Sequence, residues 1–575
     1  MVATAPTKSF PALDLRRDTR RAPDLAHFRR LYPETVASLG TLPRREEWLR
    51  KIWELESRWR KVWETRAGEA REALVRGAPP AGRAAEAEFD VIYTGGALAL
   101  LHAAALACAH KRRALVLYAD SSDSQGGRWN LSDEELRALA RAGVFSESET
   151  ACAVVNRCRG GFVKFHDAGS RVKAEPLFVS GPVDVAVDGE RLLALASERL
   201  RRQKGCAVVE GLRFVRAYVE RERVTVETED ARGARKFFVA RLLVDAGGAD
   251  SLVARQLNGG RAPSHVCPVV GTLARGFARG EGRDYADFGA CEILVSTEDA
   301  SDHRQLFWES SAGDAARDEY ATRMFFFDGT DSRADKSLLA LFERYFESLP
   351  AYKRRGAGWR VERPVFGYAA VAQPRGWRKR RPTADERVVL LGDAAGGASV
   401  FGSRTFGAAL KDLRRVAHLT HLALEADLTD APALAQISDG GPRVAEAVAL
   451  AEFMRPAPRS APSSVNETLN AIVAAVGGLD ERVRRELFQG RISLTALRSL
   501  LSRTAQVYPR IFARVREHFG ARGTFWWLAG IADAMWSERR GRTRATEETE
   551  ACATQDFGRE FARVAARYRN GDSAD

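Results

Sequence analysis

The stretch FDVIYTGGALALLHAAALACAH (residues 89–110), followed by ALVLYAD (114–120), decides the fold of this 575-residue chain. A short apolar run ends in a turn of small residues, a helix of small residues follows, and a second apolar run closes on an acid. This order and its tight spacing are typical of the β-turn-α-β unit that binds a mononucleotide. The unit predicts a Rossmann-like sheet within an α/β fold.

The turn is a variant of the GxGxxG pattern, whose glycines permit a tight bend and the close approach of a pyrophosphate. The three pattern positions hold Thr94, Gly96 and Ala99, with Gly95 between the first two. Alanine is tolerated at the third position, whereas threonine at the first is a departure. Asp120 ends the second strand, where an acid can bond a ribose hydroxyl. Gly95, Gly96, Ala99 and Asp120 are therefore predicted to bind a dinucleotide.

Two later segments repeat the pattern of an apolar strand that ends in aspartate and glycine. They are LLVDAGGADSLVAR (242–255) and VVLLGDAAGGASVFGSRTFGAALKDL (388–413). In the second, an aspartate can bond a ribitol or ribose hydroxyl, and the following helix can aim its amides at the electron-rich edge of an isoalloxazine ring. The order of the motifs predicts FAD as the cofactor. The predicted ligands here are Asp245, Gly247, Gly392, Asp393, Gly396, Arg404, Phe406 and Gly407.

The rest of the chain divides into regions on either side of this domain. A charged helical stretch with apolar residues at spacings of three and four precedes it, and a segment rich in Pro, Gly and Ala links the two. Strand-like segments follow the first unit, and the pattern becomes helical from about residue 405. We expect residues 1–85 to be a helical extension and linker. Residues 86–430 are expected to form an FAD-binding domain, with an antiparallel substrate sheet inserted at about 160–240 and 265–370. We expect residues 431–575 to be a helical region that faces a membrane.

Composition excludes several classes of protein. Hydrophobic residues make up 45% of the chain and charged residues 29%, which is ordinary for a folded domain. No stretch reaches the roughly 18–20 apolar residues that span a bilayer, and the start lacks an apolar run of signal-peptide length. We therefore expect a cytoplasmic protein. The seven cysteines include no CxxC pair, so neither a disulfide framework nor a zinc module is expected.

The charge points to an acidic partner. Lys and Arg number 89 against 76 Asp and Glu, which gives a net charge of +13. The segment TFWWLAGIADAMW (524–536) has arginines on both flanks, and it suits either the interfacial zone of a bilayer or a buried helix. A membrane surface is the expected partner, and nucleic acid is not, because no binding module accompanies the charge. His418 and His421 lack a third ligand, so no metal site is expected.

The motifs in this order resemble the FAD-dependent superfamily of aromatic hydroxylases, geranylgeranyl reductases and lycopene cyclases, and among these the CruA/CruP-type lycopene cyclases. The resemblance covers most of residues 30–430. Its most specific segments are GGRWNLSDEEL (126–136), which adds Arg128 to the predicted cofactor ligands, and HVCPVVGTLARGF (265–277). LFWES (306–310), VFGYAA (365–370) and the GDAAGG segment follow in the order of that family.

The resemblance implies a non-redox cyclisation of the ends of a carotene such as lycopene, with FAD in its reduced form. An acid protonates the terminal double bond, and an aromatic, water-free cavity stabilises the carbocation. Glu309 lies in a predicted strand among aromatic residues, and its position resembles the catalytic "F-x-E-E-T" strand of lycopene cyclases. We predict Glu309 as the proton donor, with a pKa raised by burial. Phe307, Trp308 and Phe325 to Phe327 line the cavity or the core.

Two alternatives stay open. The first is a redox flavoenzyme on the same scaffold, either a monooxygenase or a prenyl-chain reductase. The second is a non-catalytic protein that binds carotenoid or flavin at a membrane surface. Arg404 stands where the relatives carry a Gly-Gly pair, and it either stabilises negative charge on the flavin or crowds the ring.

Overall fold

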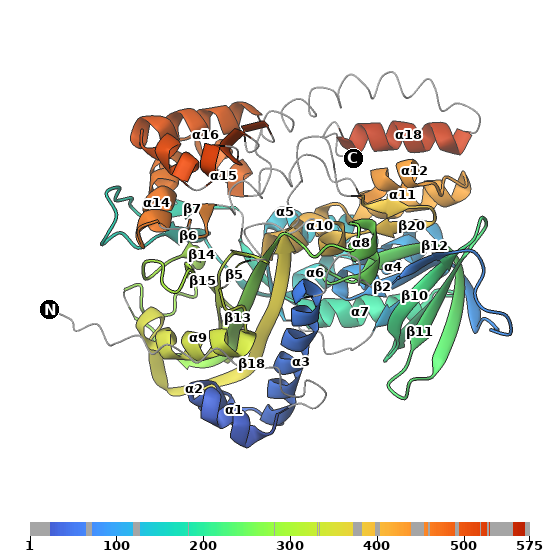
Figure 1. Cartoon of the computed structure of the whole chain (residues 1–575), viewed down its shortest axis with the longest axis horizontal. Helices are drawn as coiled ribbons and strands as arrows, with labels where there is room; N and C mark the ends of the chain where they lie inside the picture. Colours follow the sequence, from blue (N-terminus) through green and yellow to red (C-terminus); the bar gives the residue numbers. More distant parts are fainter. Residues whose placement is uncertain are drawn as a thin grey trace.

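The computed structural model describes residues 23–64, 72–118, 127–371, 382–396, 403–438, 453–529 and 556–569, except positions 182, 281, 331, 333, 458, 459, 489–493, 518, 522, 526 and 527. These residues build a nine-stranded sheet, an eight-stranded sheet and a small three-stranded sheet, with helices around them (Figure 1). The predicted α/β class with a Rossmann-like sheet and a separate antiparallel sheet is confirmed.

The nine-stranded sheet has a parallel centre. Strand β2 (Ala87–Gly95) lies between β3 (Ala114–Tyr118) and β12 (Arg235–Ala246), and both neighbours run parallel to it. The sheet continues with β9 (Ala207–Glu210) beside β3, β20 (Val388–Leu390) beside β12, the antiparallel strands β10 (Arg213–Val219) and β11 (Val224–Glu229), and the short β1 (Leu74–Arg76) and β19 (Ala384–Asp385).

Helix α4 (Ala97–His110) follows the predicted turn and is apolar on every side. Such a helix is stable only when it is buried all round. It contacts β2 and β3 on one side, and α7 (Gly189–Arg202) and α11 (Leu413–Glu425) on the others. Its alanines allow this close packing, so the small-residue composition of residues 97–107 is explained by helix burial.

The eight-stranded sheet is mostly antiparallel. Its strands are, in order, β17 (Asp328–Gly329), β13 (His265–Phe277), β16 (Glu319–Phe325), β15 (Phe307–Ala312), β14 (Cys291–Val295), β6 (Gly161–Lys164) and β7 (Leu177–Val179), with β18 (Arg355–Val371) also on β13. The boundary differs from the expected insertion at about 160–240. Residues 207–240 extend the nine-stranded sheet instead, because β10 and β11 form a meander that leads directly into β12.

The two faces of this sheet are covered differently. We call the side of Val270, Trp308 and Met324 the outer face, and it is buried under α1 (Leu25–Leu31), α2 (Pro33–Ser38), α3 (Arg45–Glu64) and α9 (Leu338–Tyr352). We call the opposite side the inner face. On this face Leu273 and its β18 partner Arg363 are half-buried, whereas Ala321 and Ser311 in the same cross-strand row are buried. The inner face meets the three-stranded sheet of β4 (Arg128–Leu131), β8 (Val185–Asp188) and β5 (Val154–Arg157) through ion pairs described below.

The N-terminal helices are tied to the outer-face helix α9 by two buried carboxylates. Glu343 of α9 accepts hydrogen bonds from Glu34 N (2.9 Å), Thr35 N (2.9 Å) and Thr35 Oγ1 (2.8 Å) at the start of α2. Glu56 of α3 in turn accepts from Ser337 Oγ (2.8 Å) at the start of α9. Negative charge at a helix N-terminus is favourable, so Glu343 of α9 caps α2, and Glu56 of α3 caps α9.

The predicted apolar stripe of α3 is confirmed. Ile52 is buried in the outer-face core, and the ring of Trp59 lies 5.1 Å from that of Tyr368 on β18. The stripe therefore packs against the eight-stranded sheet and its helix α9, and residues 45–64 form part of the body of the protein (Figure 1).

The described C-terminal helices form two groups (Figure 1). Helices α14 (Ser464–Gly477), α15 (Glu481–Phe488) and α16 (Leu494–Val507) pack at the β6–β7 end of the eight-stranded sheet. Helices α12 (Ala431–Ser438) and α18 (Asp556–Arg569) pack on α11 beside the nine-stranded sheet. Among the described residues, no helix combines the length and the hydrophobicity that crossing a bilayer requires.

Replacing Glu343 tests the cap that α9 supplies to α2. We expect Glu343→Ala to lower the free energy of unfolding by about 3 kcal/mol, since three donors lose a buried carboxylate. Glu343→Gln should cost less, because the amide keeps one acceptor. Glu198→Ala, at an exposed carboxylate of α7, is the control and should change stability by less than about 0.5 kcal/mol. Urea denaturation measures all three, and an unchanged midpoint for Glu343→Ala contradicts the account.

Candidate functional site

The first turn brings two strand ends into direct contact. Gly95 has a φ of +125°, and a Cβ at this position would lie 2.1 Å from the carbonyl oxygen of Ala246 at the end of β12. Only glycine fits here, both for its backbone angle and for the space. Gly96 is the N-cap of α4, and Ala99 is fully buried beneath it. The backbone of this turn therefore permits the close approach that a pyrophosphate needs.

The unexpected Thr94 joins the first motif to the second. Its Oγ1 donates to Asp245 Oδ1 at 3.1 Å, and Gly247 N donates to the same oxygen at 2.8 Å. Ser251 Oγ donates to the other carboxylate oxygen. Burial raises the pKa of Asp245, and these three donors oppose that rise. Asp245 therefore braces the two turns, and the threonine at a glycine position supplies one of its donors.

The third motif lies beside the other two. Leu390 is paired with Asp245 in the β12–β20 register, and Leu391 N donates to Asp245 O at 2.9 Å. A short 3-10 helix (Gly392–Ala395) follows, and a Cβ on Gly392 would lie 2.6 Å from the side chain of Leu98 in α4. Gly396 ends this turn at a φ of +82°. The three sequence motifs thus meet at one edge of the parallel sheet.

Asp393 is a carboxylate of this edge whose side chain has no hydrogen-bond or ion-pair partner among the described residues. Its side chain is half-buried, and burial raises its pKa to about 6. Within the described part of the chain, no group donates a hydrogen bond to it or forms an ion pair with it. A carboxylate in this setting is suited to accept a hydroxyl donor from a bound sugar or ribitol.

The helix after the third motif packs on the GRWNLS segment. The ring of Phe406 in α10 (Ser403–Lys411) lies 4.7 Å from that of Trp129 in β4. A Cβ on Gly407 would lie 2.6 Å from the carboxylate of Glu135, and Lys411 Nζ is 3.1 Å from Glu134 Oε2. The two acids belong to α5 (Asp133–Arg141). A side chain at position 407 would therefore displace the Glu135 carboxylate, a contact that the glycine pattern alone does not reveal.

Arg128 is held between the sheets by carboxylates. It forms ion pairs with Asp188 of β8 at 2.9 Å and with Glu319 of β16 at 2.8 Å. Glu319 also lies 3.4 Å from Arg275 on β13. In this arrangement the charge of Arg128 is neutralised by the protein, and its role is to join the three-stranded sheet to the inner face. The sequence offered no sign of Glu319.

Glu309 lies on the inner face, opposite Arg323 in the β15–β16 register. Its Oε1 is 3.4 Å from Arg323 Nη1. Phe307 and Phe325 share this face and are buried beside it. The carboxylate therefore has a cationic neighbour, whereas the sequence predicted an acid surrounded by apolar groups alone.

The predicted aromatic lining divides between the two faces. Trp308 stacks on Tyr352 of α9 at 4.2 Å in the outer-face core, and Phe326 belongs to the same core. Phe307, Phe325 and Phe327 pack together in the core near α14. Because successive residues of a strand point to opposite faces, Trp308 and Glu309 cannot line the same cavity. Of the two interpretations, cavity lining and core packing, core packing is the one that holds for Trp308 and Phe326.

Three further expectations concern positions at the margins of the site. Asp120 lies outside the described residues, and so does the side chain of Arg404. His421 stacks on His110 at 4.3 Å and accepts a hydrogen bond from Arg112 at its Nδ1. No group of described residues is arranged to hold a metal ion, and the absence of a metal site stays a prediction.

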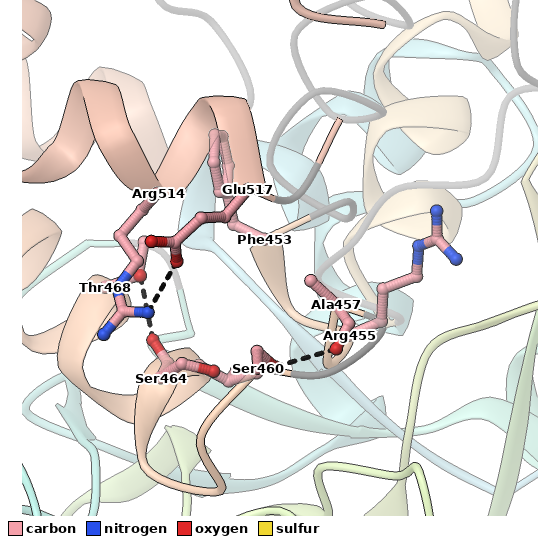
Figure 2. A pocket seen from close by; sticks show the side chains of 9 residues that line it. Phe453, Arg455, Ala457, Ser460, Ser464, Thr468, Arg514 and Glu517 are labelled. Atoms are coloured by element: carbon pink, nitrogen blue, oxygen red, sulfur yellow. Dashed lines mark hydrogen bonds and ion pairs between the residues drawn. The ribbon is translucent and has the colours of Figure 1, made fainter. Parts of the chain in front are cut away.

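A pocket outside the motif edge lies among the C-terminal helices (Figure 2). Arg514 is one of its cations, and it is already paired with Glu517 at 2.8 Å and with Glu467 at 3.6 Å. Ser460 and Thr468 donate to backbone carbonyls, so their hydroxyl protons are also engaged. The pocket contains none of the predicted ligands, and we do not assign it to the site.

The chain matches no protein-family model and no curated protein. Solved structures with a similar arrangement include halogenase PltM in complex with ethyl mercury and mercury (14% identity, 84% of this chain and 97% of that chain, TM-score 0.49). They also include p-nitrophenol 4-monooxygenase from Pseudomonas putida DLL-E4 (17%, 72% and 98%, 0.48) and a geranylgeranyl bacteriochlorophyll reductase-like protein from Thermoplasma acidophilum (14%, 75% and 98%, 0.47). Similarity at this level does not extend to activity or ligands. The resemblance to the CruA/CruP-type cyclases stays a prediction.

Substitution of Gly95 tests the contact between the strand ends. Gly95→Ala places a methyl group against Ala246 O, and we expect it to lower the free energy of unfolding by about 3 kcal/mol or more. Gly233→Ala is the matched control, because Gly233 also has a positive φ (+83°) but nothing within 4 Å of its Cβ position. It should cost only about 1 kcal/mol. Equal effects in thermal denaturation contradict the close approach.

The pH dependence of stability tests Asp393. Its pKa of about 6 lies above the ordinary value of 3.8, so the folded protein holds the proton more tightly than the unfolded chain does. The flavin-free protein should therefore gain stability as the pH falls from 7 through 6. Asp393→Asn should lack this gain and be the more stable protein at pH 7. A constant difference between the two melting temperatures from pH 7 to pH 5 contradicts this assignment.

Proposed function

We propose that the chain is an FAD-dependent enzyme whose cofactor lies along the edge where β2, β12 and β20 end. The observation that carries this proposal is Asp393, a half-buried carboxylate without a described partner, beside a turn in which Gly95 leaves no room for a side chain. A nucleotide with a hydroxylated chain would donate a hydroxyl hydrogen bond to Asp393. It would also present a group that is narrow enough to lie directly against the backbone at Gly95.

The residues present fit FAD at most points. The backbone of Gly95 and Gly96 and the N-terminus of α4 would face the pyrophosphate, and Asp393 would accept from the ribitol. Arg128 and Asp245 would act indirectly, because the protein itself satisfies both groups. Bound FAD supplies electron or hydride transfer, or oxygen activation, to whatever substrate lies against its ring.

The inner face of the eight-stranded sheet is the surface that best suits a substrate. Leu273 and Val365 are half-buried apolar residues on this face, in neighbouring cross-strand rows that also carry Arg363 and the Glu309–Arg323 pair, while the outer face is closed by helices. Ion pairs from Arg128 and Arg363 connect this face to the three-stranded sheet and to α7. An apolar substrate would bury the exposed surface of Leu273 and Val365 favourably, at about 25 cal/mol per Å² of surface removed from water.

We propose a redox reaction, either hydroxylation or reduction of an apolar chain, as the main activity. The pairing of Glu309 with Arg323 favours this alternative, because the cyclase hypothesis requires an acid in purely apolar surroundings. Lycopene cyclisation remains the second candidate. It is favoured by the position of Glu309 on the inner face beside Phe307 and Phe325.

We also propose that the C-terminal helices meet a lipid surface from which such a substrate is taken. Phe512 is 69% exposed, Phe525 65% and Leu528 53%, and exposed arginines such as Arg510 and Arg516 lie among them. Aromatic and basic residues together suit an anionic membrane surface. Of the segment predicted to bind there, Trp526, Trp527 and Trp536 lie outside the described residues.

Anaerobic reduction separates the two candidate reactions. We expect the FAD-loaded protein to be reduced by NADPH or dithionite and then reoxidised with consumption of an apolar substrate, by oxygen and substrate together in a hydroxylation, or by the substrate's double bond without oxygen in a reduction. A lycopene-accumulating host should then show no cyclic carotene. Cyclic carotene formed by the reduced protein without net change in flavin contradicts the redox proposal and supports the cyclase.

Glu309→Gln sharpens this test. If the reaction is redox, flavin content and the rate of flavin reduction should stay within about twofold of the unchanged protein, since the residue is not a proton donor to the product. If the protein is a cyclase, turnover should fall by roughly 100-fold or more while FAD is retained. Glu198→Gln, at an exposed carboxylate of α7, controls for loss of a charge alone.

A further inference from the structure

Two thiols lie in contact at the junction of the three-stranded and eight-stranded sheets. Cys158 follows β5, and Cys291 is the first residue of β14. The Cys291 thiol donates to Cys158, and the two Sγ atoms are 3.2 Å apart. In the described part of the chain, no other two cysteines are in hydrogen-bond contact.

The backbone around both thiols is fixed by hydrogen bonds. Cys291 N donates to Gly160 O at 2.9 Å, Arg159 N donates to Gly289 O at 2.9 Å, and Cys158 N donates to Asp184 O at 2.8 Å. Gly160 makes this turn at a φ of +142°, where a Cβ would lie 2.4 Å from Val179 O. A disulfide bond measures about 2.05 Å, so closing the gap needs about 1 Å of movement by the side chains.

The two thiols differ in access and acidity. Cys291 is 3% exposed, whereas Cys158 is only half-buried. The hydrogen bond from Cys291 lowers the pKa of Cys158, while the same bond and then burial raise the pKa of Cys291. A more acidic, accessible thiol beside a buried one is the arrangement in which the first reacts with an oxidant and the second resolves the product.

We propose that Cys158 and Cys291 are a redox pair that closes reversibly to a disulfide, with hydrogen peroxide as the oxidant. The Cys158 thiolate attacks one peroxide oxygen, giving a sulfenic acid, and the hydroxide that leaves takes up a proton to form water. The sulfur of Cys291, as it loses its proton, then attacks the Cys158 sulfur, and a second water leaves. Two thiols are oxidised by two electrons and one peroxide is reduced to two waters.

The disulfide would join the three-stranded sheet to the edge at which β14 pairs with β6. Cys291 is paired with Gly161 in the β14–β6 register. The bond would therefore fix the first residue of β14 to the residue that follows β5. Because the bond would link residues separated by 133 positions, it should restrict the unfolded chain strongly. The oxidised protein should melt several degrees above the reduced one. This pair is independent of the proposed flavin chemistry.

Peroxide treatment of the reduced full-length chain tests the pair. We expect the number of titratable thiols to fall from seven to five per chain, dithiothreitol to restore them, and peptide mapping to recover residues 158 and 291 joined. Cys152→Ser, at an exposed cysteine without a thiol contact, is the control and should oxidise in the same way. Cys158→Ser should keep its thiols, and Cys291→Ser should accumulate a sulfenic acid at Cys158 that dimedone traps.

The proposal is overturned if tenfold excess peroxide leaves seven thiols, or if mapping joins Cys158 to a different cysteine. It is also overturned if the Cys158→Ser protein loses two thiols like the unchanged chain. Circular dichroism of each variant checks folding. If a variant is unfolded, the peptide map of the unchanged protein decides alone.

Discussion

The contact between the backbone of Gly95 and the end of β12 is the constraint on which the proposed site depends. Because the carbonyl of Ala246 occupies the space of a side chain at position 95, the first two strand ends lie as close as backbones allow. Thr94, Asp245 and Ser251 then lock the turns together with buried hydrogen bonds. The third motif joins the same edge through the pairing of β20 with β12. One narrow edge thus collects motifs that are some 150 residues apart in the sequence.

The second organising feature is the unequal covering of the eight-stranded sheet. The outer face is sealed by α9 and the N-terminal helices, which are joined by two caps: Glu56 of α3 caps α9, and Glu343 of α9 caps α2. The inner face is joined to the three-stranded sheet by charged groups such as Arg128 and Glu319, and Leu273 and Val365 on it stay half-buried. A covered outer face and a partly exposed inner face are the reason that the proposed substrate is assigned to the inner face.

Local sequence patterns predicted what depends on local chemistry. The β-turn-α-β unit, the all-apolar α4 and the apolar stripe of α3 follow from the spacing of residues within short stretches, and all three occur in the structure. The glycine motifs also lie together at one edge, because the carboxyl ends of parallel strands meet there.

What the sequence could not supply were contacts between distant segments. The carboxylates of Glu319 and Asp188 beside Arg128 come from other strands, and so does Arg323, the cationic neighbour of Glu309, for which the sequence predicted aromatic neighbours. Trp308 was adjacent to Glu309 in the sequence but lies on the other face, because strand residues alternate. The thiol pair of Cys158 and Cys291 has no spacing that a motif could reveal, since a turn and a strand pairing bring the two together.

Titration of the flavin-free, full-length protein with FAD tests the central claim most directly. Quenching of flavin fluorescence gives both stoichiometry and affinity in one measurement. The account predicts one FAD per chain with a Kd in the micromolar range or tighter, which corresponds to about 8 kcal/mol or more of binding free energy. Absence of saturable binding up to about 1 mM FAD would contradict it, since Asp393 and the Gly95 turn would then serve no dinucleotide.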